Sequence, residues 1–139
     1  MLTAEYNLVA SGKGNSIVAK EDFRSLTYMN WFLGINSVTF ADLRTKLECC
    51  AELSCSLVTK HLNSYQGSVS NTECLHVIRV YGIATTTSKK QIQIMFDNSR
   101  LFPVNNITHQ IRFDIRSLAG DEIPADQEII IHFSLYKKK

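Results

Sequence analysis

The stretch ITHQIRFDIRS, residues 107–117, alternates between two kinds of side chain. A period of two is typical of a β-strand that has one face on the core and the other in water. The dry row holds Ile107, His109, Ile111, Phe113 and Ile115, and the wet row holds Thr108, Gln110, Arg112, Asp114 and Arg116. The wet row is either a solvated face or a surface that contacts a partner.

Three further stretches share the strand signature: CLHVIRVYGI (74–83), QIQIMF (91–96) and EIIIHFSLY (128–136). They are rich in Ile, Val, Phe and Tyr, and turn-forming residues separate them. Short connections favour antiparallel pairing of consecutive strands, because a parallel pair needs a long crossover. Residues 5–10 predict a further short strand.

The N-terminal half shows the longer period of a helix. Apolar residues recur every three to four positions over residues 40–62, and Thr39 with Asp42 nearly matches a capping box. This pattern predicts one long helix. Residues 20–34, KEDFRSLTYMNWFLG, predict a shorter helix with Asp22 as its N-cap and Gly34 at its end.

Helices followed by strands indicate an α+β fold. We expect an antiparallel sheet of four to five strands packed against one long and one shorter N-terminal helix, with the dry row on the long helix. The chain has 139 residues, of which 45% are hydrophobic, and this is enough for one domain with its own core. We expect a flexible or short-strand segment over residues 1–20 and a single globular domain over residues 21–139.

No stretch carries a catalytic or metal-binding signature. Cys49, Cys50, Cys55 and Cys74 lack the C-x-x-C spacing of a zinc or redox site, so we expect structural thiols. His76 and His132 could face each other if their strands pair. The loops SGKGNS (11–16) and DEIPAD (121–126) lack the spacing of a phosphate loop and of a calcium loop. We therefore expect no enzyme, no cofactor and no metal; a small Cys/His hydrolase is the weakest of three alternatives.

The N-terminus has no charged start followed by an apolar block, and the apolar stretches are far shorter than the ~18–20 residues of a spanning helix. We expect no secretion signal and no transmembrane segment. The cysteines should then stay reduced in a cytosolic compartment.

The formal net charge is only +2, and this value does not indicate that the molecule as a whole binds nucleic acid. Cations do recur in the C-terminal half, and together they form a candidate surface for an anionic partner, either RNA or a membrane: Lys89, Lys90, Arg112, Arg116, Lys137, Lys138 and Lys139. The alternative is an ordinary wet face with cross-strand ion pairs and a solubilising tail.

The C-terminal stretch SRLFPVNNITHQIRFDIRSLAGDEIPADQEIIIHF, residues 99–133, resembles the late segment of rhabdovirus matrix proteins. An Arg-aromatic-Pro start, a long alternating strand, an acidic turn and a final apolar segment carry the resemblance, and DFRSLTYMNW (22–31) resembles the early helix start of the family. The resemblance implies a sheet packed on helices and a non-enzymatic viral structural protein. Such a protein self-associates, condenses the ribonucleoprotein and lies on the inner face of a membrane, in the host cytoplasm and in the virion.

Two departures from the family matter. The N-terminus has only Lys13 and Lys20 where the family often has a lysine-dense arm, and it has no Pro-rich budding motif. The basic tail at residues 137–139 would be the nearest substitute for membrane contact. The resemblance implies self-association through an arm or loop, for which the candidate residues are Ser11, Gly12, Lys13, Gly14, Tyr65 and Gly67. The alternative function is a small cytosolic protein–protein interaction module that binds through a sheet edge or a helix face.

Overall fold

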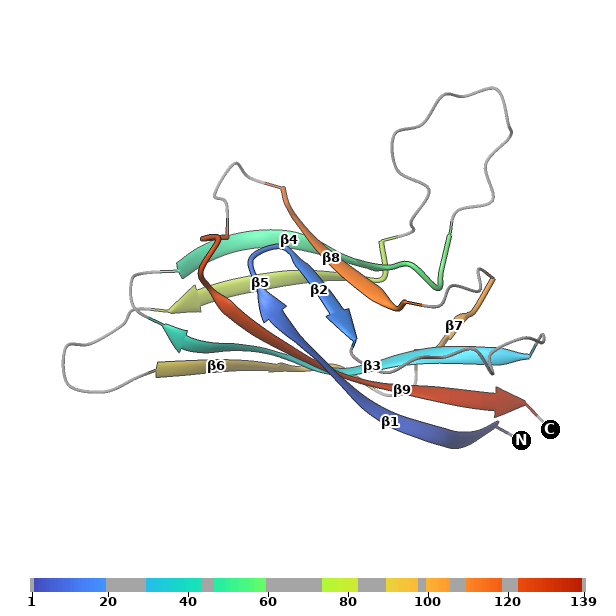
Figure 1. Ribbon diagram of the computed structural model, residues 1–139. Coiled ribbons are helices and arrows are strands. Elements are labelled where there is room, and N and C mark those ends of the chain that lie inside the picture. The colour runs from blue at the N-terminus through green and yellow to red at the C-terminus, as the bar shows by residue number, and fades with distance from the viewer. Residues whose placement is uncertain are drawn as a thin grey trace, which may run out of the picture.

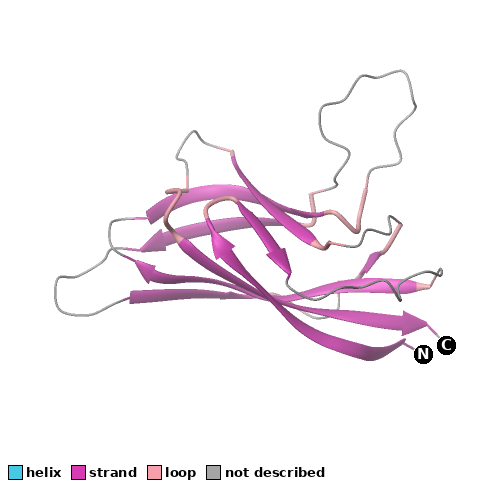
Figure 2. Ribbon diagram, viewed as in Figure 1, coloured by secondary structure: helices cyan, strands magenta, loops and turns pink. Residues whose placement is uncertain are grey.

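The computed structural model describes residues 2–19, 30–43, 47–59, 74–82, 90–97, 100–105, 110–118 and 123–138. Within these ranges the regular elements are all β-strands, and no helix occurs (Figure 2). The expected α+β fold is therefore wrong: the described chain is an all-strand structure, and no helix covers its sheet.

Nine strands follow one another along the described chain. They are β1 (Leu2–Lys13), β2 (Ser16–Ala19), β3 (Trp31–Leu43), β4 (Leu47–Cys55), β5 (His76–Gly82), β6 (Lys90–Met95), β7 (Phe102–Pro103), β8 (Arg112–Ser117) and β9 (Glu128–Lys138). Eight of them form one path of neighbours in the order β5-β4-β8-β2-β1-β9-β3-β6, and β7 pairs with β3 beside this path. Every pairing is antiparallel.

The sheet folds over into two layers, with β5, β4 and β8 above β9, β3 and β6, and the β1–β2 hairpin joins the layers (Figure 1). The side chains between the layers are apolar and buried, as alternation along each strand requires. The rings of Phe113 on β8 and Phe133 on β9 meet edge to face with their centroids 4.9 Å apart. These two strands share no backbone pairing, so side-chain packing joins the layers at this point.

The N-terminal segment lies inside the sheet. β1 pairs with β9 from Leu2 to Lys13, and its end pairs with β2. The strand expected at residues 5–10 is confirmed and is longer than expected. Gly14 occupies the turn between β1 and β2 with a φ of 84°, a conformation that glycine adopts without steric cost, and its N–H donates to the carbonyl of Gln127.

The long helix expected over residues 40–62 is wrong. Its described part is the end of β3, all of β4 and the turn after β4. Leu47, Ala51, Leu53 and Cys55 are buried, while Glu48 is exposed and the other described residues between them are only half-buried. This burial pattern has the period of two of a strand. Pairing with β5 on one side and β8 on the other outweighs the helix propensity of the Leu, Glu and Ala residues.

The shorter helix expected over residues 20–34 is wrong where the structure describes it. Residues 31–34 begin β3, in which Trp31, Leu33 and Ile35 point to the core. Residues 20–29 lie outside the described part.

The four expected C-terminal strands are confirmed as β5, β6, β8 and β9, but their partners differ from the expectation. Each pairs with a strand from the N-terminal half: β5 with β4, β6 with β3, β8 with β4 and β2, and β9 with β1 and β3. The dry row is confirmed for Ile111, Phe113 and Ile115, which are buried against β9 and its neighbours instead of a helix. Ile107 and His109 lie outside the described residues.

Candidate functional site

The strands β5 and β6 are the two ends of the sheet path, and each has one backbone-paired neighbour within the described part of the chain. They approach each other where the folded sheet almost closes, but no register pairs join them. We call the gap between these two strands the seam. An unpaired strand edge presents a row of backbone N–H and C=O groups to any chain that can pair with it.

Aromatic side chains bridge one end of the seam. The imidazole of His76 on β5 stacks on Phe96, just after β6, with ring centroids 4.2 Å apart. It also meets the ring of Phe102 on β7 edge to face at 5.4 Å, and the guanidinium of Arg100 lies 5.2 Å from the Phe102 centroid. These contacts hold β5 near β6 without backbone hydrogen bonds.

The surroundings of the His76 imidazole disfavour its charged form. Its Nε2 atom is buried and has no hydrogen-bond partner among the described residues. Burial, and secondly the charge of Arg100, lower the pKa of His76 below its ordinary value of 6.5. Both effects favour the neutral form of the ring at the seam.

The backbone N–H and C=O groups at the free edge of β6 come from every second residue. Ser37 to Phe40 of β3 pair in register with Met95 to Ile92, and the N–H of Phe96 donates to the carbonyl of Asn36 at 3.0 Å. Backbone groups alternate in direction along an antiparallel strand. Since Phe96 bonds toward β3, the N–H and C=O groups of Gln91, Gln93 and Met95 point away from β3, toward the open edge.

The side chains of β6 also differ by face. Gln91, Gln93 and Met95 are exposed on the outside, and the Met95 side chain reaches 68% exposure. Ile92 and Ile94 are half-buried and pack against the core from its rim. From Gln91 to Phe96 the sequence has no charge and no proline, which are the usual devices that keep an edge strand from pairing. Between Lys90 at its start and the His76–Phe96 contact at its end, the β6 edge is therefore unprotected.

The β5 edge is different. Among the side chains described for β5, Val77 is 55% exposed, and Arg79 is also exposed and places a charge in the middle of the strand. A charge on an edge strand opposes pairing with another strand. Of the two edges, β6 is the better docking site.

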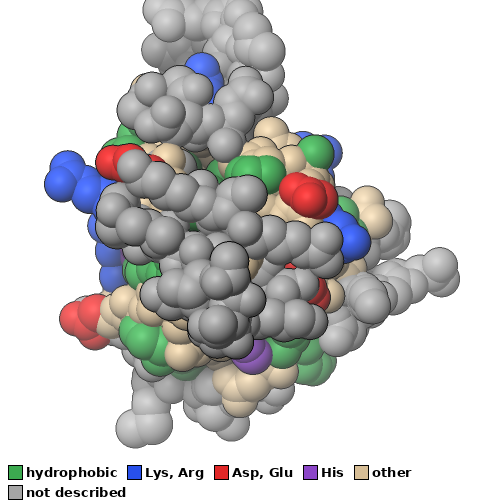
Figure 3. Space-filling model, turned by 90° about the vertical axis from the view of Figure 1, so that its left-hand side faces the viewer, with side chains coloured by type: hydrophobic (Ala, Val, Ile, Leu, Met, Phe, Trp, Pro, Cys, Tyr) green, Lys and Arg blue, Asp and Glu red, His purple; other side chains and the backbone are tan. Residues whose placement is uncertain are grey.

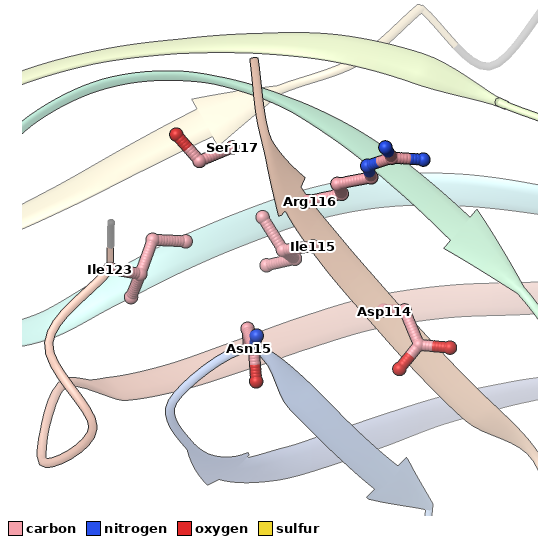
Figure 4. A pocket seen from close by; sticks show the side chains of 6 residues that line it. All are labelled: Asn15, Asp114, Ile115, Arg116, Ser117 and Ile123. Carbon is pink, nitrogen blue, oxygen red and sulfur yellow. The ribbon is translucent and has the colours of Figure 1, made fainter. Parts of the chain in front are cut away.

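A pocket of about 360 Å³ lies at β8, beside the β1–β2 turn (Figure 4). It is lined by Asn15, Asp114, Ile115, Arg116, Ser117 and Ile123. Figure 4 shows Ile115 and Ser117 on one side of β8 and Asp114 and Arg116 on the other, as expected for alternating residues. Asp114 is also held by Arg112, whose Nε lies 3.2 Å from its Oδ2. The charged groups therefore do not converge with the Ser117 hydroxyl on one point.

The expected cationic surface is dispersed. Arg112 and Arg116 lie on the outer face of β8, where Arg116 stands opposite Glu52 of β4 and Arg112 pairs with Asp114. Lys90 begins β6, while Lys137 and Lys138 end β9 beside the chain terminus (Figure 1). Lys89 and Lys139 lie outside the described residues. On the face in Figure 3, both basic and acidic side chains of the described residues appear, with basic groups along the left edge between acidic ones.

The expected self-association segments are placed as follows. Ser11, Gly12 and Lys13 belong to β1, where Ser11 pairs with Val18 on one side and Ile130 on the other, and Gly14 is in the turn. The backbone of this segment is thus already paired within the chain. Tyr65 and Gly67 lie outside the described part.

The thiols and imidazoles do not form a site in the described residues. Cys50, Cys55 and Cys74 form no disulfide within the described part, and burial raises the pKa of Cys55 to about 12, which opposes thiolate formation. His76 and His132 do not face each other, because β5 and β9 are not neighbours. The described residues contain no group of three or more His, Cys, Asp or Glu side chains that could hold a metal ion.

Sequence reasoning missed the β6 edge as a site, although the signal was present. QIQIMF alternates as a strand while lacking charge and proline, and this combination indicates an unprotected edge once the strand is known to be terminal in its sheet. The position in the sheet could not be read from the segment itself.

Within the described ranges, no helix is long and apolar enough to cross a membrane. Comparison with models of known protein families and with curated proteins yields no match for this chain.

Proposed function

We propose that this chain is a non-enzymatic structural protein that works by associating with further copies of itself through a strand edge. The observation that carries the proposal is the unprotected β6 edge, with outward backbone groups at Gln91, Gln93 and Met95 and no charge or proline from Gln91 to Phe96. A strand that exists only to close a fold is normally covered or charged at its free side.

The geometry of the polar groups gives little support to the hydrolase alternative. The Cys55 thiol is wholly buried with a raised pKa, and the Cys74 thiol donates to the backbone carbonyl of His76. In the pocket on β8, Asp114 and Arg116 point away from Ser117 (Figure 4).

Contacts with a ribonucleoprotein and an anionic membrane, implied by the resemblance to rhabdovirus matrix proteins, form a further part of this proposal. They would depend on Arg112, Arg116 and the β9 end at Lys137 and Lys138. These cations are spread over separate strands, so any such binding would consist of weak, salt-dependent contacts. The rival function is an interaction module that accepts a strand from a different protein at the same edge.

Sedimentation velocity of the purified chain over a wide concentration range, at low and high salt, tests the proposal. An assembly protein shows a sedimentation coefficient that rises with concentration. A chain that stays monomeric throughout contradicts self-association and leaves the interaction module as the better function. Binding of vesicles with anionic lipid, compared with neutral vesicles, tests the membrane part separately.

A further inference from the structure

We propose that two copies of the chain pair through antiparallel β6 strands about a two-fold axis at Gln93, so that the lower layers of both copies form one continuous sheet. This inference rests on the proposed self-association and specifies its surface and register.

The backbone directions select this register. In a two-fold antiparallel pair centred on Gln93, Gln93 lies opposite its own counterpart, and Gln91 lies opposite Met95 of the second copy. These are the residues whose N–H and C=O groups point away from β3. Each pair can therefore exchange both backbone hydrogen bonds.

Other registers use the edge less well. Centring the pair on Ile92 or Ile94 would pair only two of the outward residues, Gln91 with Gln93 or Gln93 with Met95, and would leave the third without a partner inside the strand. Centring it on Gln91 or Met95 would leave part of the outward row unpaired beyond the end of the neighbouring strand. The register at Gln93 alone pairs all three outward residues.

The side chains are complementary to themselves in the same register. On the inner face Ile92 meets Ile94 of the second copy, which extends the apolar rim and covers side chains that are half-buried in the single chain. On the outer face the uncharged Gln93 side chains meet each other. This self-complementarity favours a second copy over a foreign strand.

The charges that flank β6 agree with this arrangement. The strand begins at Lys90 and is followed by Asp97, so an antiparallel pair sets the basic start of one strand beside the acidic end of the other. A parallel pair would instead place like charges together at both ends.

The strand is short, so the dimer should be weak. A pairing of about six residues buries less than the roughly 1,200 Å² of a standard interface, and we expect association only at high protein concentration.

Site-specific disulfide cross-linking of the full chain tests the register. Gln93→Cys places two thiols opposite each other at about 5.5 Å between Cα atoms, a separation that a disulfide can span. Gln91→Cys and Met95→Cys are matched controls on the same exposed face, and in each of them the two copies of the new thiol are about 13 Å apart. The unmodified chain measures the background from the native cysteines.

The proposal expects oxidised dimer above background from Gln93→Cys alone, little from either control alone, and dimer again when Gln91→Cys and Met95→Cys chains are mixed. Equal cross-linking of all single variants, or cross-linking of none above background, overturns the register. Sedimentation of the unmodified chain distinguishes a failure of the β6 pairing from a failure of the proposed function. If the chain self-associates while this cross-linking pattern is absent, the proposed function stands and the β6 pairing is wrong. If the chain stays monomeric, both are wrong.

Discussion

Replacing the two rings that join the layers of the sheet should reveal an energetic coupling between β8 and β9. Phe113 and Phe133 are both wholly buried, and their rings meet edge to face at 4.9 Å. Truncating Phe133 to alanine should cost about 3–5 kcal/mol, because the ring leaves a cavity in a packed core. That is a large part of the roughly 5–15 kcal/mol by which a domain is stable, so Phe→Leu changes, which keep most of the volume, are better suited to a quantitative test.

The assay is a double-mutant cycle with Phe113→Leu, Phe133→Leu and the double variant, followed by urea unfolding. Beyond their buried area, such ring pairs contribute about 0.5–1.5 kcal/mol, and this should appear as the coupling free energy. Met95→Ala combined with Phe113→Leu is the control. Met95 is exposed on the opposite face of the lower layer, so these two changes should add. Additivity of the two ring changes would refute the packing of β8 on β9.

Three further predictions follow from particular residues. Because burial lowers the pKa of His76, the unfolded chain binds a proton at this residue more readily than the folded chain does. The contribution of His76 to stability should therefore be complete above about pH 6.5 and should fall as the pH drops below that value. Thermal unfolding at a series of pH values should show this dependence in the unmodified chain and its loss in His76→Phe. Gly14→Ala should cost about 1–2 kcal/mol in urea unfolding, since alanine is strained at a φ of 84°; an unchanged midpoint would contradict the turn. Gln93→Lys should weaken self-association about tenfold or more in sedimentation by setting like charges opposite each other, whereas Val9→Lys, which adds the same charge on the central strand β1, should leave it unchanged; equal effects would argue against the β6 edge.

The C-terminal strands could be predicted because their own residues decide them. In β8 and β9 the alternation of large apolar and polar side chains is long and matches the observed burial. Their partners could not be predicted, because sheet order depends on contacts between distant segments. β9, for example, lies between β1 and β3, both from the N-terminal half of the chain.

The error over β4 has a definite physical origin. LECCAELSC combines strong helix formers with small apolar cysteines, so its apolar residues satisfy both a helical stripe and an alternating row. Long-range pairing with β5 and β8 decides between the two patterns. The same limit applies to the β6 edge: its residues were visible in the sequence, but its place at the end of the sheet was not.

Amide hydrogen exchange of β6, followed by NMR at increasing protein concentration, is the decisive measurement for this edge. The amides of Gln91, Gln93 and Met95 should exchange rapidly in dilute solution and gain protection as the concentration rises. The amides of Ile92 and Ile94, which point to β3, should be protected throughout. Protection of all five amides at every dilution would mean that the β6 edge is already paired within one chain. Rapid exchange of the three outward amides at every concentration would mean that no second strand pairs with this edge. Either result would contradict self-association through β6.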